Sequence, residues 1–126
     1  MRLTIEDLQD SIVRFTTNFG TAVAKWNGPL IGRGSTVDVE LDIDRVLDDS
    51  VVQILDDPEP PQISGDETNV TITATVEHIW DDWVIFLRLA DSCTIMVESV
   101  AGACAVGQCV RIRIPPEMFS VTPYGY

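Results

Sequence analysis

The chain has 126 residues, of which 45% are hydrophobic and 22% charged, a composition typical of one globular domain with a single core. Its 20 acidic and 8 basic residues give a net charge of −12, which repels phosphate backbones and argues against nucleic-acid binding. The acidic opening segment lacks the basic end of a secretion signal, and no apolar run reaches about 18 residues, so we expect a cytoplasmic protein that does not enter a membrane.

Residues 1–35 carry the least regular pattern, and we treat them as an N-terminal extension of uncertain structure. Thr4 and Asp7 fit a capping box, which favours a short helical turn. Residues 11–15 and 21–26 alternatively form a hairpin around residues 18–20. We expect the helical turn first and β-structure after it.

Residues 36–47 show the clearest strand pattern of the chain. Apolar side chains alternate strictly with acidic ones, which is typical of a half-buried strand. Residues 51–55 follow a polar turn and are a candidate hairpin partner. Residues 56–68 hold three prolines, one glycine and five acids, which predicts an exposed loop.

From residue 69 onward the pattern is that of short strands separated by turns. The predicted strands cover residues 69–79, 83–89, 93–97 and 109–114, and residues 117–123 add a short last strand or a helical turn. Residues 102–107 form a small-residue connection, and Pro115 and Pro116 end the strand before them. We therefore predict one all-β domain spanning residues 1–126, an OB-like small barrel of five to seven strands within residues 36–126 and at most one short helix. A sandwich is the alternative.

The segment 69–123 resembles an OB-type barrel, reading NVTITATVEHIW, a turn, WVIFLRLADS, CTIMVES, a glycine-containing crossing and GQCVRIRIPPEMFSVTP. Its last part, with Gly107 before a Val-x-Ile-x-Ile strand and the pair Pro116 and Glu117, is similar to the carboxyl-terminal ligand-binding modules of molybdate-type transporters. The order TVDVELDID, acidic loop, hairpins and final Val-Thr-Pro-Tyr also resembles small bacterial proteins, some of which are immunity proteins encoded near toxins. OB-type barrels bind oligonucleotides, oligosaccharides, anions or proteins, so the resemblance implies binding without selecting the ligand.

Reactive side chains are few. His78 is the single histidine and shares parity with Val76 and Trp80, so we assign it a structural role rather than that of a catalytic base. The three cysteines, Cys93, Cys104 and Cys109, lack the paired spacing of zinc or redox motifs, and we expect reduced, buried thiols; a zinc site with His78 is the weaker alternative. We predict no enzyme activity, no metal and no cofactor.

Two groups of residues are candidate partner contacts. Asp38, Glu40, Asp42 and Asp44 share one face of the predicted strand, about 6.6–6.8 Å apart, where they either form a solvated face or a docking strip for a basic protein. Calcium is disfavoured because the Gly-centred loop of an EF-hand is missing.

The second group is the run Trp80, Asp81, Asp82 and Trp83, which either caps the barrel or presents an aromatic hot spot with an acidic rim. Parity points Trp80 inward and groups Trp83 with Ile85, and we expect at least one indole to stay partly exposed.

These patterns favour a non-enzymatic protein-binding module, such as an immunity or inhibitor protein that masks a basic partner, for example a nuclease toxin. One alternative is an anion- or sugar-binding module that uses residues 102–107 and 92–99. Another is a structural or assembly subunit, and nothing in the sequence defines the oligomeric state.

Overall fold

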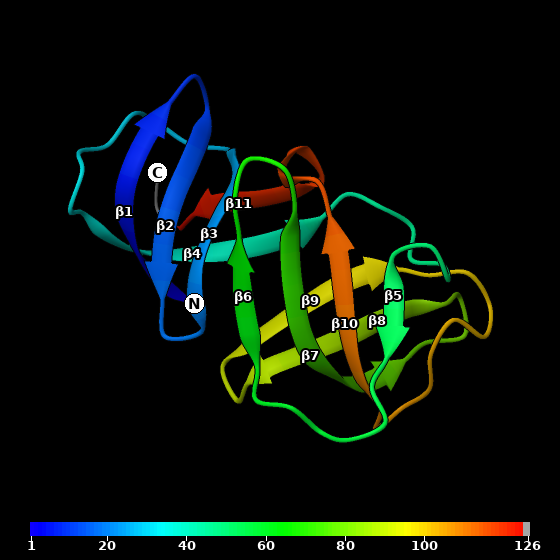
Figure 1. The fold of residues 1–126 in the computed structure, drawn as a ribbon. Coiled ribbons are helices and arrows are strands. Elements are labelled where there is room, and N and C mark those ends of the chain that lie inside the picture. Colours follow the sequence, from blue (N-terminus) through cyan, green and yellow to red (C-terminus); the bar gives the residue numbers. More distant parts are fainter. Residues whose placement is uncertain (125–126) are drawn as a thin grey trace.

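The structure of the protein is a computed structural model, and it describes residues 1–124 (Figure 1). Its regular structure is almost entirely β, which confirms the predicted fold class. In chain order the elements are β1 (Arg2–Gln9), β2 (Ile12–Thr17), β3 (Gly20–Trp26), β4 (Thr36–Ile43), β5 (Val52–Ile54), β6 (Gln62–Gly65), β7 (Val70–Ile79), β8 (Val84–Ala90), β9 (Cys93–Glu98), β10 (Cys109–Ile114), the 3-10 helix η1 (Pro116–Met118) and β11 (Phe119–Pro123).

Five strands close into a small barrel in the order β1, β2, β3, β11, β4. Neighbouring strands are antiparallel except β3 and β11, which run parallel. The rings of Phe15 and Phe119 meet between β2 and β11 with centroids 6.3 Å apart, and both side chains are fully buried. The last strand of the chain therefore closes a barrel that the first four strands begin.

The chain between β4 and β11 builds a second sheet in the order β5, β10, β7, β8, β9. Strand β6 pairs with the first half of β7, and β8 pairs with the second half. Figure 1 shows this sheet, in green, yellow and orange, beside the barrel. Buried apolar side chains from the barrel and the sheet belong to one hydrophobic cluster, so the two parts share a core.

The barrel and the sheet meet tightly where β3 begins. The Ile63 amide of β6 donates a hydrogen bond to the Phe19 carbonyl (3.1 Å). Gly20 has a φ of +134°, and a Cβ added there would lie 2.3 Å from the Ile63 carbonyl oxygen. Only glycine fits this backbone-to-backbone approach, which we call the β3–β6 junction.

Most of the predicted strands are confirmed. The alternating segment is β4, with a burial pattern that alternates along all eight residues. Residues 12–26 form the hairpin of β2 and β3, and the segment after Pro115 contains both the helical turn η1 and the strand β11. These elements were predictable because their periodicity is local.

The helical turn predicted at the N-terminus is wrong, because those residues form β1. Leu3 and Ile5 are buried while β1 pairs with β2 and β4, so ladder formation overrides the capping box of Thr4 and Asp7. Asp10 and Ser11 have φ values of 53° and 64° in the two-residue turn between β1 and β2, which is type I′ geometry.

The predicted position of the barrel is also wrong. Strands β1, β2 and β3 are part of the closed barrel, whereas the segment 69–123, which resembled an OB-type barrel, supplies β7 to β10 of the second sheet and only β11 of the barrel. The reason is that barrel closure depends on pairing between chain ends, which no local pattern encodes.

Two local predictions need correction as well. Residues 52–54 do not pair with β4, because β4 is flanked by β1 and β11 while β5 pairs with β10. The proline-rich loop contains strand β6, whose Ile63 is fully buried at the β3–β6 junction. A single apolar residue in that acidic segment was sufficient to anchor it.

Candidate partner-binding surface

The acidic ridge, defined as Asp38, Glu40, Asp42 and Asp44, lies on the outer face of β4 and just beyond its end. All four residues are exposed, while Val39 and Leu41 between them are buried. Arg2 forms an ion pair with Asp38 (Nε to Oδ1, 3.2 Å), and within residues 1–124 the other three carboxylates have no ion-pair partner. The ridge therefore remains a row of largely uncompensated negative charge.

A β-bulge in β7 changes which side chains face outward. The pairing of β7 with β8 shifts between Val76 and His78, so Glu77 is the extra residue. His78 and Trp80 consequently lie on the outer face, and Trp80 is 38% exposed. The inward orientation predicted for Trp80, and the parity that grouped His78 with Val76, are wrong for this reason.

The outward side chains beyond the bulge form a small aromatic cluster. The Trp80 ring packs edge-on against Phe86 with centroids 4.1 Å apart, and against His78 at 4.7 Å. Met96 is the cross-strand partner of Phe86 on β9 and is 55% exposed. We call Trp80, Phe86 and Met96 the apolar platform.

The turn between β7 and β8 holds the second predicted group. The Trp83 amide donates to the Trp80 carbonyl (3.0 Å), and Trp83 adopts a φ of 61°. This is a three-residue loop that ends in a left-handed residue. Trp83 is 37% exposed, so both indoles are partly exposed, which confirms that at least one is. Asp81 and Asp82 extend from the tip of the turn.

Met96 brings the two predicted groups together. Three hollows on this side of the molecule all include it, with volumes of about 560, 370 and 530 Å³. The first reaches Asp44, the second reaches Glu40 and Asp42, and the third is lined by Trp80, Asp81 and Asp82. Trp83 and Asp38 line none of the three.

The predicted partner contacts did not include Met96, Val84 and Glu98, which line the hollow beside Asp44. A signal for one of them was present. The segment CTIMVES alternates, and Met96 is the one apolar residue on its polar face, between Thr94 and Glu98.

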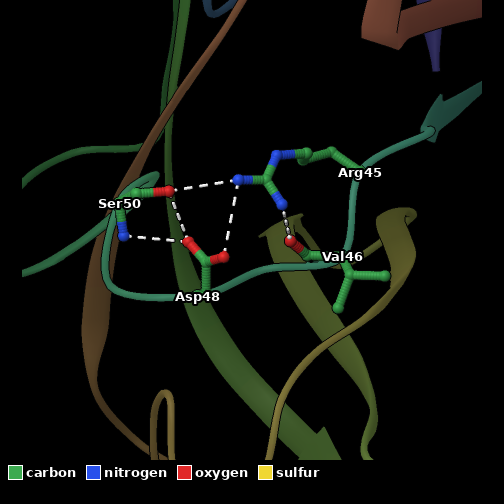
Figure 2. A network of polar contacts seen from close by, with 4 residues as sticks. All are labelled: Arg45, Val46, Asp48 and Ser50. Carbon is green, nitrogen blue, oxygen red and sulfur yellow. Dashed lines mark hydrogen bonds and ion pairs between the residues drawn. The ribbon is translucent and has the colours of Figure 1, made fainter.

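The end of the ridge is fixed by a polar network around Asp48 (Figure 2). Arg45 Nη1 donates to the Val46 carbonyl (2.8 Å), and Arg45 Nη2 donates to Ser50 Oγ (3.1 Å) and lies 3.5 Å from Asp48 Oδ2. Hydrogen bonds from the Ser50 hydroxyl and then its amide lower the pKa of Asp48, with a further contribution from Arg45. Arg45 lines the hollow beside Asp44, but these contacts hold its guanidinium on Asp48.

The cysteines are free and buried, as predicted. Burial raises the pKa values of the Cys93 and Cys104 thiols, which keeps them protonated at neutral pH. Among residues 1–124 no group of three or more His, Cys, Asp or Glu side chains is placed to hold a metal ion. No helix in the same range is long and apolar enough to cross a membrane.

Of the residues considered for anion or sugar binding, 102–107 and 92–99, only Gly102 and Ala103 line a separate hollow of about 350 Å³. Residues 100–103 line one side, and Asp48, Asp49 and Ser50 line the other. Two carboxylates in the lining oppose an anion there.

Comparisons with known proteins add no relative. A scan against protein-family models finds no match, and searches of curated proteins and of solved structures find no similar protein. The fold and the surface together define an all-β protein with a small closed barrel, compatible with an OB-like barrel, joined to a second sheet.

Proposed function

We propose that this protein is a non-enzymatic binding module that holds a basic protein partner against the acidic ridge and the apolar platform. Immunity and inhibitor proteins that mask a basic partner, such as a nuclease toxin, belong to this functional class. The observation that carries the proposal is that Met96 joins the hollows of the ridge to the hollow of Trp80 and Asp82.

The surface combines the two features that protein partners use. Exposed Met and Trp side chains are enriched where interfaces bury most of their binding energy, and the platform presents both. The surrounding carboxylates, including Glu40, Asp42 and Glu98, supply an acidic rim. A net charge of −12 raises the association rate with a cationic partner and makes that rate sensitive to salt.

The test of the proposal separates the effect of the ridge charges on binding from the effect of the net charge. The triple variant Glu40→Gln, Asp42→Asn, Asp44→Asn removes three ridge charges. The matched control Asp49→Asn, Asp56→Asn, Asp57→Asn removes three exposed charges elsewhere. Both variants change the net charge equally, so they differ only in where the charge is lost.

Binding of a fluorescent polylysine peptide is measured by anisotropy over a range of salt concentrations. We expect the ridge variant to bind at least about tenfold more weakly, and the control to lose about threefold or less. If the two variants lose affinity equally, only net charge acts and the ridge is not the binding site.

A further inference from the structure

The outer face of β8 and β9 carries two apolar side chains that belong to two hollows at once. In the antiparallel pairing of these neighbouring strands, Val84 lies opposite Glu98 and Phe86 lies opposite Met96 (Figure 1). Side chains opposite each other project from the same face of a sheet, with Cβ atoms about 4.5–5.5 Å apart. Val84 and Met96 line both the hollow of about 560 Å³ and the hollow of about 530 Å³. We call these two residues the shared pair.

The hollow of about 560 Å³, which we call the ridge hollow, combines apolar and acidic residues. Val46 and Met96 are exposed apolar side chains in its lining. Asp44 and Glu98 also line it, and neither carboxylate has an ion-pair partner within residues 1–124. Arg45 is a further lining residue, but its guanidinium is already engaged in the polar network of Figure 2. The ridge hollow therefore keeps an apolar surface beside two unpaired negative charges.

The hollow of about 530 Å³, which we call the turn hollow, repeats this combination. Its lining consists of the shared pair, Trp80, Asp81 and Asp82. The Asp82 carboxylate accepts a hydrogen bond from the Val84 amide (3.4 Å), which holds it beside the shared pair. In the described part of the chain neither Asp81 nor Asp82 forms an ion pair. Trp80 is partly exposed, and an indole beside carboxylates attracts a cation.

An apolar surface next to unpaired carboxylates fits one type of side chain. Lysine and arginine pack their long apolar stems on apolar surface while the charged end stays near water and opposite charge. An acidic side chain would be repelled from either hollow, and an apolar one would leave the carboxylates without a partner. Charge complementarity therefore assigns a basic side chain to each hollow.

We propose that the ridge hollow and the turn hollow each receive one lysine or arginine side chain of the same partner segment. This inference rests on the proposed function and adds the motif that is recognised, which is two basic side chains at a defined spacing. Two linked contacts reinforce each other, because binding of the first side chain holds the second at a high effective concentration near its own hollow. Affinity therefore depends on the spacing of the two basic residues as well as on their charge.

Capped peptides in a glycine–serine background provide the probe. One peptide has a single lysine, and four have two lysines separated by zero, one, two or three residues, so these four carry the same charge. An NMR titration of the ¹⁵N-labelled protein measures binding, with the Trp80 indole and the Glu98 amide as reporters of the two hollows. We expect the best two-lysine peptide to bind at least about tenfold more tightly than the single-lysine peptide, and about fivefold more tightly than the worst spacing.

The outcomes of this titration separate the inference from the proposed function. Equal affinities for the four spacings would show that only charge is recognised, which overturns the inference and leaves the proposed function standing. If polylysine binds and none of the five peptides does, the inference is wrong in the same way. If polylysine does not bind either, the proposed function itself fails.

Variants of the protein test each hollow separately. Three double variants each remove two exposed charges: Asp44→Asn with Glu98→Gln in the ridge hollow, Asp81→Asn with Asp82→Asn in the turn hollow, and Asp56→Asn with Asp57→Asn, between β5 and β6, as the control. Because the remaining hollow still holds one lysine, both hollow variants should bind the single-lysine peptide within about threefold of the wild type. For the best two-lysine peptide each should lose at least about tenfold, and the control about twofold or less. Equal losses in all three variants contradict the inference.

Met96→Gln tests the shared pair without a change in charge. Glutamine has a similar length but a polar end, so it offers less apolar surface to the lysine stems. We expect the best two-lysine peptide to bind at least about fivefold more weakly, while Val106→Thr, at an exposed valine outside both hollows, leaves binding unchanged. Unchanged binding by Met96→Gln would contradict the packing of both stems on the shared pair.

Discussion

The barrel meets the second sheet in two places that differ in character. At the β3–β6 junction the backbones touch: the Ile63 amide bonds to the Phe19 carbonyl, and Gly20 leaves no room for a side chain. The second place, which we call the β4–β9 seam, is where β4 and β9 lie near each other; within residues 1–124 no ladder joins the two strands, and two hollows are lined by residues of both. One boundary is closed through its backbone, and the other is open along its backbone.

The difference separates a boundary that holds the two parts together from one that leaves hollows at the surface. A closed junction fixes how the barrel sits on the sheet, and the shared hydrophobic cluster supports that placement. The β4–β9 seam therefore does not need a backbone ladder, because the junction and the shared core already hold the two parts together. The exposed carboxylates of the acidic ridge beside it repel one another modestly, which is a cost for folding.

The largest effect is expected from Gly20→Ala, which breaks the closed junction. A methyl group there meets the Ile63 carbonyl at 2.3 Å on a backbone with φ of +134°, so the variant loses about 2–5 kcal/mol of unfolding free energy. Gly34→Ala is the control, since its φ is +86° and nothing lies within 4 Å; it should lose about 1 kcal/mol. Urea denaturation measures both, and similar losses would show that the junction is not tightly closed.

The next largest effect is a gain in stability, which we expect from Thr73→Val on β7. The Thr73 hydroxyl is fully buried and has no hydrogen-bond partner among the described residues. Replacing it with a methyl group of similar shape removes a desolvation penalty, so stability rises by about 1 kcal/mol. Thr75→Val, at a half-buried position of the same face, should change stability by about 0.5 kcal/mol or less. A loss of stability in Thr73→Val would mean that the hydroxyl has a partner.

Within the barrel, Ser11→Gly tests the turn between β1 and β2. Ser11 has a φ of 64° in the type I′ turn between β1 and β2, a conformation that glycine adopts without strain. The variant should gain about 0.5 kcal/mol, read as a higher midpoint of thermal unfolding. Ser35→Gly, at a position without a positive φ, should lose stability instead. A loss in both variants would argue against the assigned turn.

The smallest effect concerns Asp48, the centre of the polar network at the end of the acidic ridge. Its pKa is lowered, chiefly by the Ser50 hydroxyl, so the charged form stabilises the folded state. That stability is present above the unfolded pKa near 3.8 and is lost as the pH falls through the lower folded value. Asp48→Asn should therefore melt below the wild type at neutral pH, and the difference should vanish in acid once the pH is below the lowered folded pKa. A difference that persists unchanged in acid would point to a cause other than charge.

Local patterns predicted the ridge well because strand alternation at Asp38, Glu40 and Asp42 needs no knowledge of the partner strands. The same reasoning failed at Trp80, where the bulge at Glu77 shifts parity by one residue. A bulge is a property of two paired strands, so one strand's pattern does not reveal it.

Long-range pairing explains the remaining errors. The barrel is closed by β11 against β3 and β4, and Ile63 becomes buried only when β6 reaches Phe19. The sequence shows Met96 as an apolar residue on a polar face. That Met96 lies beside both the ridge and the turn at Asp82 depends on the packing of distant segments. The sequence therefore predicted the ridge and the turn separately, but not that they lie on the same side of the molecule.

Residue-resolved hydrogen exchange tests the open seam most directly. The amides of Thr94 and Met96 should exchange much faster than those of Ile95 and Val97 on the same strand, because only the second pair bonds to β8. Protection of Thr94 and Met96 in the protein alone would mean that β4 and β9 are already paired, and would contradict the account.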